Sequence, residues 1–303
     1  MRFSIWPSAA QPWKDILEIT THCEQTGWDG VYFADHFMPN GPGPEALDGN
    51  TLECWSVIAA LAASVPRLRL APLVTSVTYR HPAVLANIAA AVDQISAGRL
   101  SLGIGAGWQE NEHASYGITL GGVRERMDRL EEAAHILRSL LGERRTTFSG
   151  RYFQLTDAPN QPAPVQDRLP LLIGGGGEQR TLRIAARYAD HWNYWSTPDV
   201  LAHKLAVLRR HCDDLGRDPA DIHISTQARL FLSTDETWLA GKREVQLPQP
   251  VIVGTPAEVA EIVVRYRDAG ADEIIVPDAT LGTGSRKKDT CDLFMAQVAS
   301  AAR

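Results

Sequence analysis

The dipeptide Asp35-His36 follows an apolar run that we predict to be a strand. Neighbouring strand residues point to opposite faces, so only one of the two side chains can face the interior of the fold. A histidine there can accept a proton from a substrate alcohol, because the ordinary pKa of histidine lies near neutrality. The residue type therefore predicts a general base at His36. The alternative is a histidine that only hydrogen-bonds a loop.

Four consecutive glycines, Gly174–Gly177, stand between a predicted strand and a predicted helix. Glycines let backbone N–H groups approach an anion, and a helix N-terminus adds a partial positive charge. A Walker loop is excluded, because no Gly-Lys-Ser/Thr follows. We predict that Gly175, Gly176 and Gly177 hold a phosphate group. A flexible turn is the alternative, although four glycines are more than a turn requires.

A second glycine pattern, Gly103-x-Gly105-x-Gly107, overlaps the end of the apolar run Leu100–Ile104 and precedes Trp108. It matches a dinucleotide-binding fingerprint only in part, because tryptophan stands where the third glycine belongs and the strand is not the first of the chain. At the rim of a barrel, such glycines would make room for a ring system. We therefore predict that Gly105, Gly107 and Trp108 line a cofactor site.

Metal-binding patterns are weak. Two Glu-x-x-His pairs, Glu110/His113 and Glu132/His135, have the spacing of di-iron bundles, but such bundles need further helices and this chain is rich in strands. We interpret both pairs as surface helix residues and expect no metal. The four cysteines form no CxxC pair and are expected to be reduced. They are Cys23, Cys54, Cys212 and Cys291.

Composition narrows the class of protein. The 303 residues are 44% hydrophobic, enough for a sizeable core, and carry a net charge of −6 with no cluster of Lys and Arg, which argues against nucleic-acid binding. The first residues lack the layout of a signal peptide, and no apolar stretch approaches membrane-spanning length. We expect a cytoplasmic protein with no nucleic-acid or membrane partner.

Eight apolar runs of strand length alternate with eight stretches of helical spacing. We expect the strands at Arg2–Trp6, Gly30–Asp35, Arg69–Val77, Leu100–Ile104, Pro170–Gly174, His191–Tyr194, His223–Leu232 and Glu273–Pro277. We expect the helices at Trp13–Gln25, Leu52–Ser64, Pro82–Ser96, Arg124–Leu141, Gln179–Tyr188, Pro198–Asp214, Ala257–Ala269 and Asp289–Ala301. Strict alternation with short joins implies parallel strands and right-handed crossovers. We predict one (β/α)8 TIM barrel over residues 1–303, with a doubly wound sheet as the alternative.

Three connections are too long for simple turns: Phe37–Asn50, Thr146–Asp167 and Ser233–Val253. Long segments in compact domains are often lids or binding loops. Two of the three follow strands, so in a barrel they would overhang its C-terminal face, where the active sites of this fold lie. We expect insertions in the loops of that face.

Seven segments in fixed order carry a family resemblance that spans nearly the whole chain. They are Ala34–Phe37 (ADHF), Thr75–Val77 with His81–Ala83, Ser96–Glu112, Ile173–Gly177, Tyr188–Asn193, Gly254–Glu261 and Gly270–Pro277. Together they resemble the bacterial luciferase-like monooxygenase superfamily, and within it the branch that uses the deazaflavin coenzyme F420. The resemblance implies a barrel, commonly a homodimer, with a ring in its mouth and a phosphate on the glycine run.

The resemblance also implies roles for single residues. A non-prolyl cis peptide behind the deazaflavin maps to Ser76-Val77, and Asp35 falls among the cofactor-binding residues. His36 matches the base of alcohol-oxidising relatives. Asn111 matches an amide near the pyrimidine edge of the ring.

One position departs from the pattern. Sugar-phosphate dehydrogenase relatives place a glutamate proton donor where this chain has Trp108, so their full mechanism does not transfer. Trp108 is expected to shape an apolar pocket or to stack on a ring. Glu53 or Glu112 would supply a carboxylate, and the sequence does not rank them.

These features predict an oxidoreductase that moves a hydride between F420 and a small, largely apolar organic substrate. The first alternative is an FMN-dependent, oxygen-using monooxygenase on the same fold, because the phosphate site serves either cofactor. The second is a flavin-binding barrel without catalysis. A homodimer is expected from the resemblance, and alanine-rich helices at Val57–Ser64 and Val84–Ala91 would allow close packing.

Overall fold

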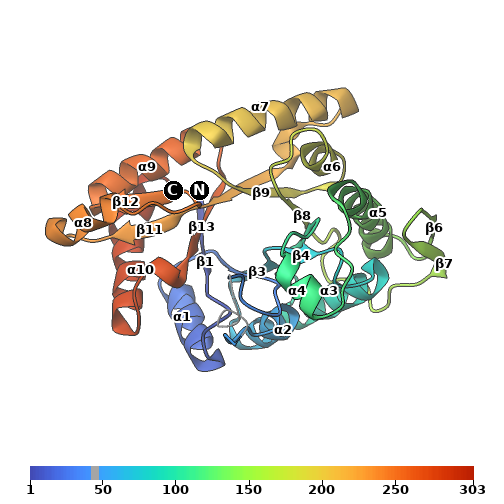
Figure 1. Cartoon of the computed structure of the whole chain (residues 1–303), viewed down its shortest axis with the longest axis horizontal. Coiled ribbons are helices and arrows are strands. Elements are labelled where there is room, and N and C mark those ends of the chain that lie inside the picture. The colour runs from blue at the N-terminus through green and yellow to red at the C-terminus, as the bar shows by residue number, and fades with distance from the viewer. Residues whose placement is uncertain (42–47) are drawn as a thin grey trace.

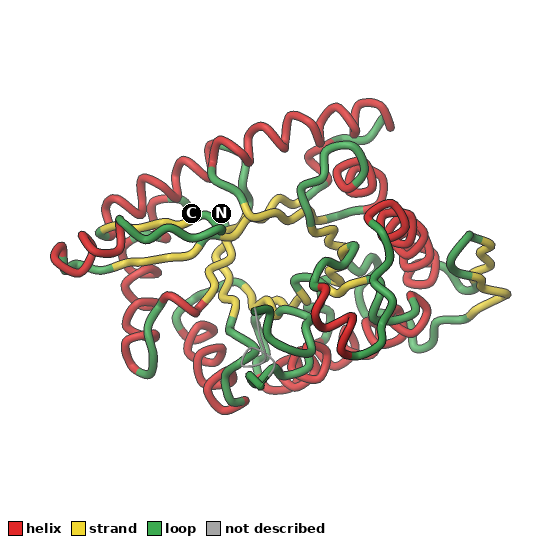
Figure 2. Tube along the Cα trace, viewed as in Figure 1, coloured by secondary structure: helices red, strands yellow, loops and turns green. Residues whose placement is uncertain are grey.

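A closed barrel of parallel strands forms the centre of the computed structural model, which describes residues 1–41 and 48–303. The sheet order is β3-β2-β1-β13-β10-β9-β8-β5-β4. The first and last members, β3 and β4, are successive pieces of the predicted third strand, and an isolated bridge joins Leu70 to Leu100. The sheet therefore closes into a ring, visible end-on in Figure 2, and the predicted (β/α)8 barrel is confirmed.

The barrel strands are short and almost wholly buried. They are β1 (Arg2–Trp6), β2 (Gly30–Phe33), β3 (Arg69–Pro72), β4 (Thr75–Ser76), β5 (Leu102–Gly105), β8 (Leu171–Gly174), β9 (His191–Trp195), β10 (His223–Gln227) and β13 (Glu273–Pro277). Several of them, such as β2, β5 and β8, are continuous runs of apolar residues and glycine, because they are buried on both faces, against the barrel interior on one side and the helices on the other.

Helices surround the ring (Figure 1). They are α1 (Trp13–Gln25), α2 (Cys54–Ser64), α3 (Pro82–Ser96), α4 (Glu110–Ser115), α5 (Val123–Gly142), α6 (Thr181–Tyr188), α7 (Pro198–Leu215), α8 (Glu236–Arg243), α9 (Pro256–Asp268) and α10 (Ser285–Gln297). Local sequence sets several starts: Thr255 and Glu258 form a reciprocal capping box at α9, and Pro256 occupies its first turn. No helix in these ranges is long and apolar enough to cross a membrane.

The predicted seventh strand, His223–Leu232, is wrong in its extent. The chain leaves the ring after β10, and β11 (Arg229–Leu232) pairs in parallel with β12 (Val251–Gly254) in a separate two-stranded sheet. The helix α8 and all but the last residue of β12 fall within Ser233–Val253, which we expected to be a loop. We predicted one strand straight across Ala228, although polar residues, Gln227 and Arg229, flank it at the point where the chain changes sheet.

The other two insertions differ in what they contain. Thr146–Asp167 holds an antiparallel hairpin of β6 (Thr146–Ser149) and β7 (Gln154–Ala158). Residues 42–47 of the insertion Phe37–Asn50 lie outside the described residues. The four cysteines are buried and free, as expected.

A polar cluster fills the barrel at the end where the strands begin. Glu273, at the start of β13, accepts hydrogen bonds from Ser4, from the Tyr32 hydroxyl at 3.0 Å and from His223 Nε2 at 2.9 Å. Burial would raise the pKa of Glu273, but the hydrogen bond from His223 and the other partners lower it to about 2. The carboxylate is therefore charged, and hydrogen bonds offset the cost of burying it.

His191 lies beside this carboxylate, with Nε2 2.6 Å from Ser225 Oγ. Burial lowers the pKa of His191 to about 3, so its imidazole is neutral. Among the described residues, His191, His223 and Glu273 form the one group whose ligand atoms, all within 4.8 Å of one another, are spaced for a metal. Protein hydrogen bonds already engage each of the three, and the expected absence of a metal stays a prediction.

Acid should destabilise this cluster. Glu273 stabilises the fold fully above about pH 4.5, and this contribution is lost as the pH falls toward 2. His191 takes up a proton near pH 6.5 only when unfolded, so its contribution is lost as the pH falls from 6.5 toward 3. We expect the free energy of unfolding in urea to fall by about 1–2 kcal/mol between pH 7 and pH 5. His191→Gln should show a smaller fall, and an equal fall in both proteins would contradict the assignment.

Candidate active site

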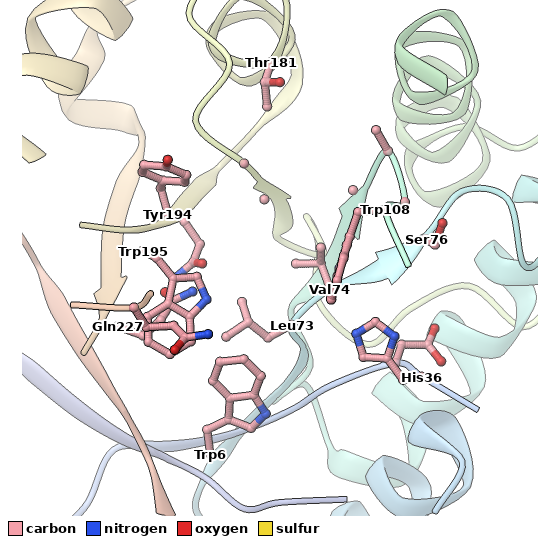
Figure 3. A pocket seen from close by; sticks show the side chains of 18 of the residues that line it. Trp6, His36, Leu73, Val74, Ser76, Trp108, Thr181, Tyr194, Trp195 and Gln227 are labelled. Atoms are coloured by element: carbon pink, nitrogen blue, oxygen red, sulfur yellow. The ribbon is translucent and has the colours of Figure 1, made fainter. Parts of the chain in front are cut away.

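A cavity of about 550 Å³ opens at the carboxyl ends of the barrel strands (Figure 3). This volume lies within the usual range for ligand pockets. Its walls differ in chemistry. One wall is glycine-rich and follows β5 and β8, with Gly105, Gly107, Gly174 and Gly175. The other is aromatic and is formed at the ends of β1 and β9 by Trp6, Tyr194 and Trp195.

His36 lines this cavity, three residues beyond the end of β2. Its Nδ1 lies 2.8 Å from Glu112 Oε1 on α4, and its ring packs edge-on against Trp108 at 5.5 Å between centroids. Because the carboxylate accepts from Nδ1, the Nε2 atom is the one left for a ligand. The structure thus places His36 and Trp108 together at the rim.

Glu112 is the centre of this part of the site. Its fully buried carboxylate also accepts from the Phe37 backbone N–H at 2.9 Å and from the Tyr79 hydroxyl. Burial raises the pKa of the Glu112 carboxyl, but these hydrogen bonds and that from His36 outweigh it and lower the pKa below its ordinary value. Burial and the adjacent carboxylate raise the pKa of Tyr79, which therefore remains a donor.

The structure separates the two carboxylates that the sequence left unranked. Glu53 accepts from the Ser56 backbone N–H at the start of α2 and pairs with Arg80 at 2.5 Å, so it serves the helix end. Only Glu112 contacts His36. Asp35 also pairs with Arg80, at 2.6 Å, and burial raises its pKa despite that cation. Asp35 lines the cavity, but its carboxylate is engaged by the arginine.

The glycines of β5 allow close packing against the neighbouring part of the protein. A Cβ at Gly103 would lie 2.1 Å from the Pro72 carbonyl oxygen, and one at Gly105 would lie 2.7 Å from Val74 Cγ2. These positions therefore make room for the third barrel strand. Gly105 and Gly107 also line the cavity, and their contact with a cofactor ring stays a prediction. Val74 in turn lines the cavity beside Gly105.

The non-prolyl cis peptide bond joins Leu73 to Val74, not Ser76 to Val77 as the resemblance implied. It lies in the break between β3 and β4, whereas Ser76 belongs to β4 and pairs in regular register with Gly105. Leu73, Val74 and Ser76 line the cavity, and Val77 is buried outside the lining.

The glycine run after β8 is only partly available to an anion. The Gly175 N–H donates to the Asn193 carbonyl at 3.0 Å, so this amide is occupied. The N–H groups of Gly176 and Gly177 have no partner within the described part of the chain. Both precede α6, whose first residue, Thr181, lines the cavity. The two amides with this helix start fit a phosphate group.

Bulk is excluded at Gly176. A Cβ there would lie 2.6 Å from atoms of the Tyr194 ring, which lines the cavity, so only glycine fits without a shift of the ring. Gly176 and Gly177 are not among the lining residues, but Gly175 before them and Thr181 after them are.

Asn111 lies outside the cavity lining. Its Nδ2 donates to the Pro39 carbonyl at 3.0 Å and its Oδ1 accepts from the Glu112 backbone N–H at 2.9 Å. The side chain therefore holds the segment after His36 against α4. A contact between Asn111 and a cofactor ring stays a prediction.

The surface interpretation of the Glu-x-x-His pairs is wrong for His113. This residue is buried, with Nε2 2.7 Å from Thr78 Oγ1 and Nδ1 2.6 Å from the Gln109 carbonyl. Glu132 accepts from the backbone N–H groups of residues 151–153 and so fixes the turn of the β6–β7 hairpin.

Gln227 is a lining residue that sequence reasoning missed. It ends β10, whereas the predicted strand continued to Leu232 and placed it in the interior of a strand. The available signal was the change in character at this point, where the polar stretch Ser225-Thr226-Gln227 gives way to the more apolar residues 228–232.

The fold and the site define a parallel β/α barrel with a ligand cavity and a carboxylate-supported histidine at the carboxyl ends of its strands. The profile of the family described as luciferase-like monooxygenase matches residues 1–238. The chain belongs to this family, which confirms the resemblance seen in the sequence.

Two curated relatives and one solved structure are similar to the chain. It is 32% identical over 228 residues to the F420-dependent glucose-6-phosphate dehydrogenase of Kineococcus radiotolerans, covering 73% of this chain and 64% of that protein. It is 30% identical over 248 residues to the F420-dependent hydroxymycolic acid dehydrogenase of Mycobacterium tuberculosis, covering 78% and 66%. The matched segments thus span just under two thirds of these relatives. An F420-dependent secondary alcohol dehydrogenase in complex with an F420-acetone adduct superposes with a TM-score of 0.85 at 21% identity over all of both chains, which supports the fold.

Replacing the carboxylate at the centre of the site should loosen it. In Glu112→Gln, one of the three donors faces an amide N–H₂ in place of an acceptor. We expect the free energy of unfolding to fall by about 1–3 kcal/mol. Glu110→Gln, an exposed glutamate on the same helix, is the matched control and should leave stability unchanged. Equal denaturation midpoints for the two variants would show that the Glu112 hydrogen bonds contribute little.

Proposed function

We propose that this chain is an F420-dependent oxidoreductase that interconverts a small alcohol and its carbonyl compound. The observation that carries the proposal is the 2.8 Å contact between His36 Nδ1 and the buried Glu112 carboxylate, which leaves Nε2 for the cavity. The names of the two curated dehydrogenases support the choice of cofactor.

The residues of the glycine-rich wall fit such a cofactor. The unoccupied N–H groups of Gly176 and Gly177 and the Thr181 hydroxyl would hold its phosphate. Val74 and Ser76 would support its ring, and Asp35 borders the same space. A bound deazaflavin supplies a carbon centre that exchanges hydride and reacts poorly with oxygen.

The chain itself handles the proton. His36 Nε2 would accept the hydroxyl proton of an alcohol, or return it to a carbonyl compound in the reverse direction. The Glu112 carboxylate fixes the imidazole with its proton on Nδ1 and stabilises the positive charge that forms. Trp6, Trp108 and Trp195 line the cavity with apolar surface, and a bound substrate and cofactor would displace water from it.

His36→Ala should lower the turnover of alcohols by about 10²–10⁴-fold, because it removes the general base. The affinity for F420, measured by fluorescence titration, should change little, because His36 follows β2 whereas the glycines proposed to hold the phosphate follow β8. His22→Ala, which removes a histidine paired with Asp292, is the control and should retain activity. Full turnover in His36→Ala would exclude His36 as the base.

Titration of the purified protein with F420 and with FMN separates the proposal from its alternatives. We expect F420 to bind, and Gly176→Ala to weaken binding about tenfold or more, because its methyl group displaces the Tyr194 ring. FMN binding without any F420 response would favour an oxygen-using monooxygenase. F420 binding without turnover of any alcohol would favour a barrel that binds flavin without catalysis.

The assembly and location of the protein belong to the same proposal. We propose that residues 1–303 act as one domain and form a homodimer in the cytoplasm. The support for a dimer is the family and the alanine-rich α2 and α3. Small side chains on these helices would allow a second copy to approach closely.

A further inference from the structure

One buried amide oxygen in the cavity lacks a hydrogen-bond partner within residues 1–41 and 48–303. Gln227 is 3% exposed, and its Oε1 accepts no hydrogen bond from the residues that the structure describes. Figure 3 shows Gln227 on the same side of the cavity as Trp195, with His36 on the opposite side. The ring order agrees, since β1 and β13 separate β10 from β2. The amide is thus remote from the histidine in the same cavity.

An unpaired polar group of this kind is costly. Burying an amide oxygen without a partner costs about 1–3 kcal/mol, and buried polar groups in folded proteins nearly always have a partner. On its side of the cavity, Figure 3 shows the largely apolar side chains of Trp6, Leu73 and Trp195. The amides of Asn193 and Gln249 also line the cavity, but neither donates to Gln227 Oε1. A ligand that enters the cavity is therefore the natural source of the missing hydrogen bond.

The charged side chains around the cavity restrict the charge that such a ligand can carry. The lining of the described part contains no Lys or Arg, and residues 42–47 contain none in their sequence. The nearby Arg80 is paired with Asp35 and Glu53. A phosphate group on the substrate would thus meet aromatic rings and no unpaired cation on this wall.

We propose, on the basis of the function proposed above, that the substrate is uncharged and has two polar ends. A flat apolar body lies along Trp6 and Trp195, an alcohol or carbonyl group reaches His36, and a second hydroxyl or carbonyl group pairs with the Gln227 amide. An amide offers both donors and an acceptor, so either group is recognised. Gln227 selects among alcohols, and the lack of an unpaired cation in the described cavity lining disfavours phosphorylated sugars as substrates.

A matched pair of alcohols tests this assignment. The two probes are 4-phenyl-2-butanol and 4-(4-hydroxyphenyl)-2-butanol, which differ only in one hydroxyl group at the far end. Calorimetry on the F420-loaded protein should show about tenfold or tighter binding of the hydroxylated compound, as one hydrogen bond to a buried partner provides. In Gln227→Met, which keeps the length of the side chain without the amide, the ratio should fall to about one. Gln227→Leu repeats the test with a shorter side chain.

The control is Gln297→Met on the exposed end of α10, which should keep the preference and the thermal midpoint of the parent. Glucose 6-phosphate should neither bind nor compete. Equal affinities for the two alcohols in the parent, or an unchanged ratio in both Gln227 variants, would overturn the proposal. Tight binding of glucose 6-phosphate would overturn the uncharged substrate class.

Two further outcomes separate the possible causes of failure. A loss of F420 affinity in Gln227→Met, with the alcohol ratio unchanged, would assign the amide to the cofactor and overturn the proposal. Binding affinity and turnover are separate measurements. If both alcohols bind with the expected affinities but neither is oxidised, the role of Gln227 is supported. That result would instead contradict the oxidoreductase function.

Discussion

The hydrogen bonds to the buried Glu112 carboxylate are the interaction on which the candidate site depends. They join α4 to two segments that follow different strands, because His36 and Phe37 come after β2 and Tyr79 comes after β4. A carboxylate without contact to water is tolerated only when its oxygens are fully engaged, and here three donors meet them. The same contacts hold the imidazole in one tautomer, so the interaction that stabilises the rim also prepares its chemistry.

The barrel contains two buried carboxylates with different consequences. At the end where the strands begin, Ser4, Tyr32 and His223 all direct their hydrogen bonds at Glu273. At the other end, the network around Glu112 leaves a ring nitrogen facing a cavity. Barrels of this kind place stability at one face and chemistry at the other. The two hydrogen-bond networks show this division: the one around Glu273 serves stability, and the one around Glu112 leaves a nitrogen atom free for chemistry.

The ring of strands could be predicted because most of its strands lie in largely apolar runs and the helices between them have helical spacing, both of which are local properties. The structure differs from the prediction where a local sequence pattern is compatible with two structures. The predicted seventh strand runs across Ala228, where the chain changes sheet, and the four residues of β12 are too few to stand out from a loop. The cis bond lies at Leu73-Val74 in the break of the third strand, three residues before the position that the resemblance implied.

The candidate site shows even more clearly that local sequence patterns do not determine contacts between distant segments. His36, Trp108 and Ser76 could be placed at the cavity because they follow strands that end at one face. The choice between Glu53 and Glu112 could not be made, because it depends on which helix start faces β2, and residue spacing does not contain that information. The glycines illustrate a further point. Gly103 and Gly105 are small because Pro72 and Val74 occupy the adjacent space, and it is Val74 that forms the wall. A glycine pattern thus marks a close approach of backbone, and only the structure shows whether the neighbour is a ligand or the protein itself.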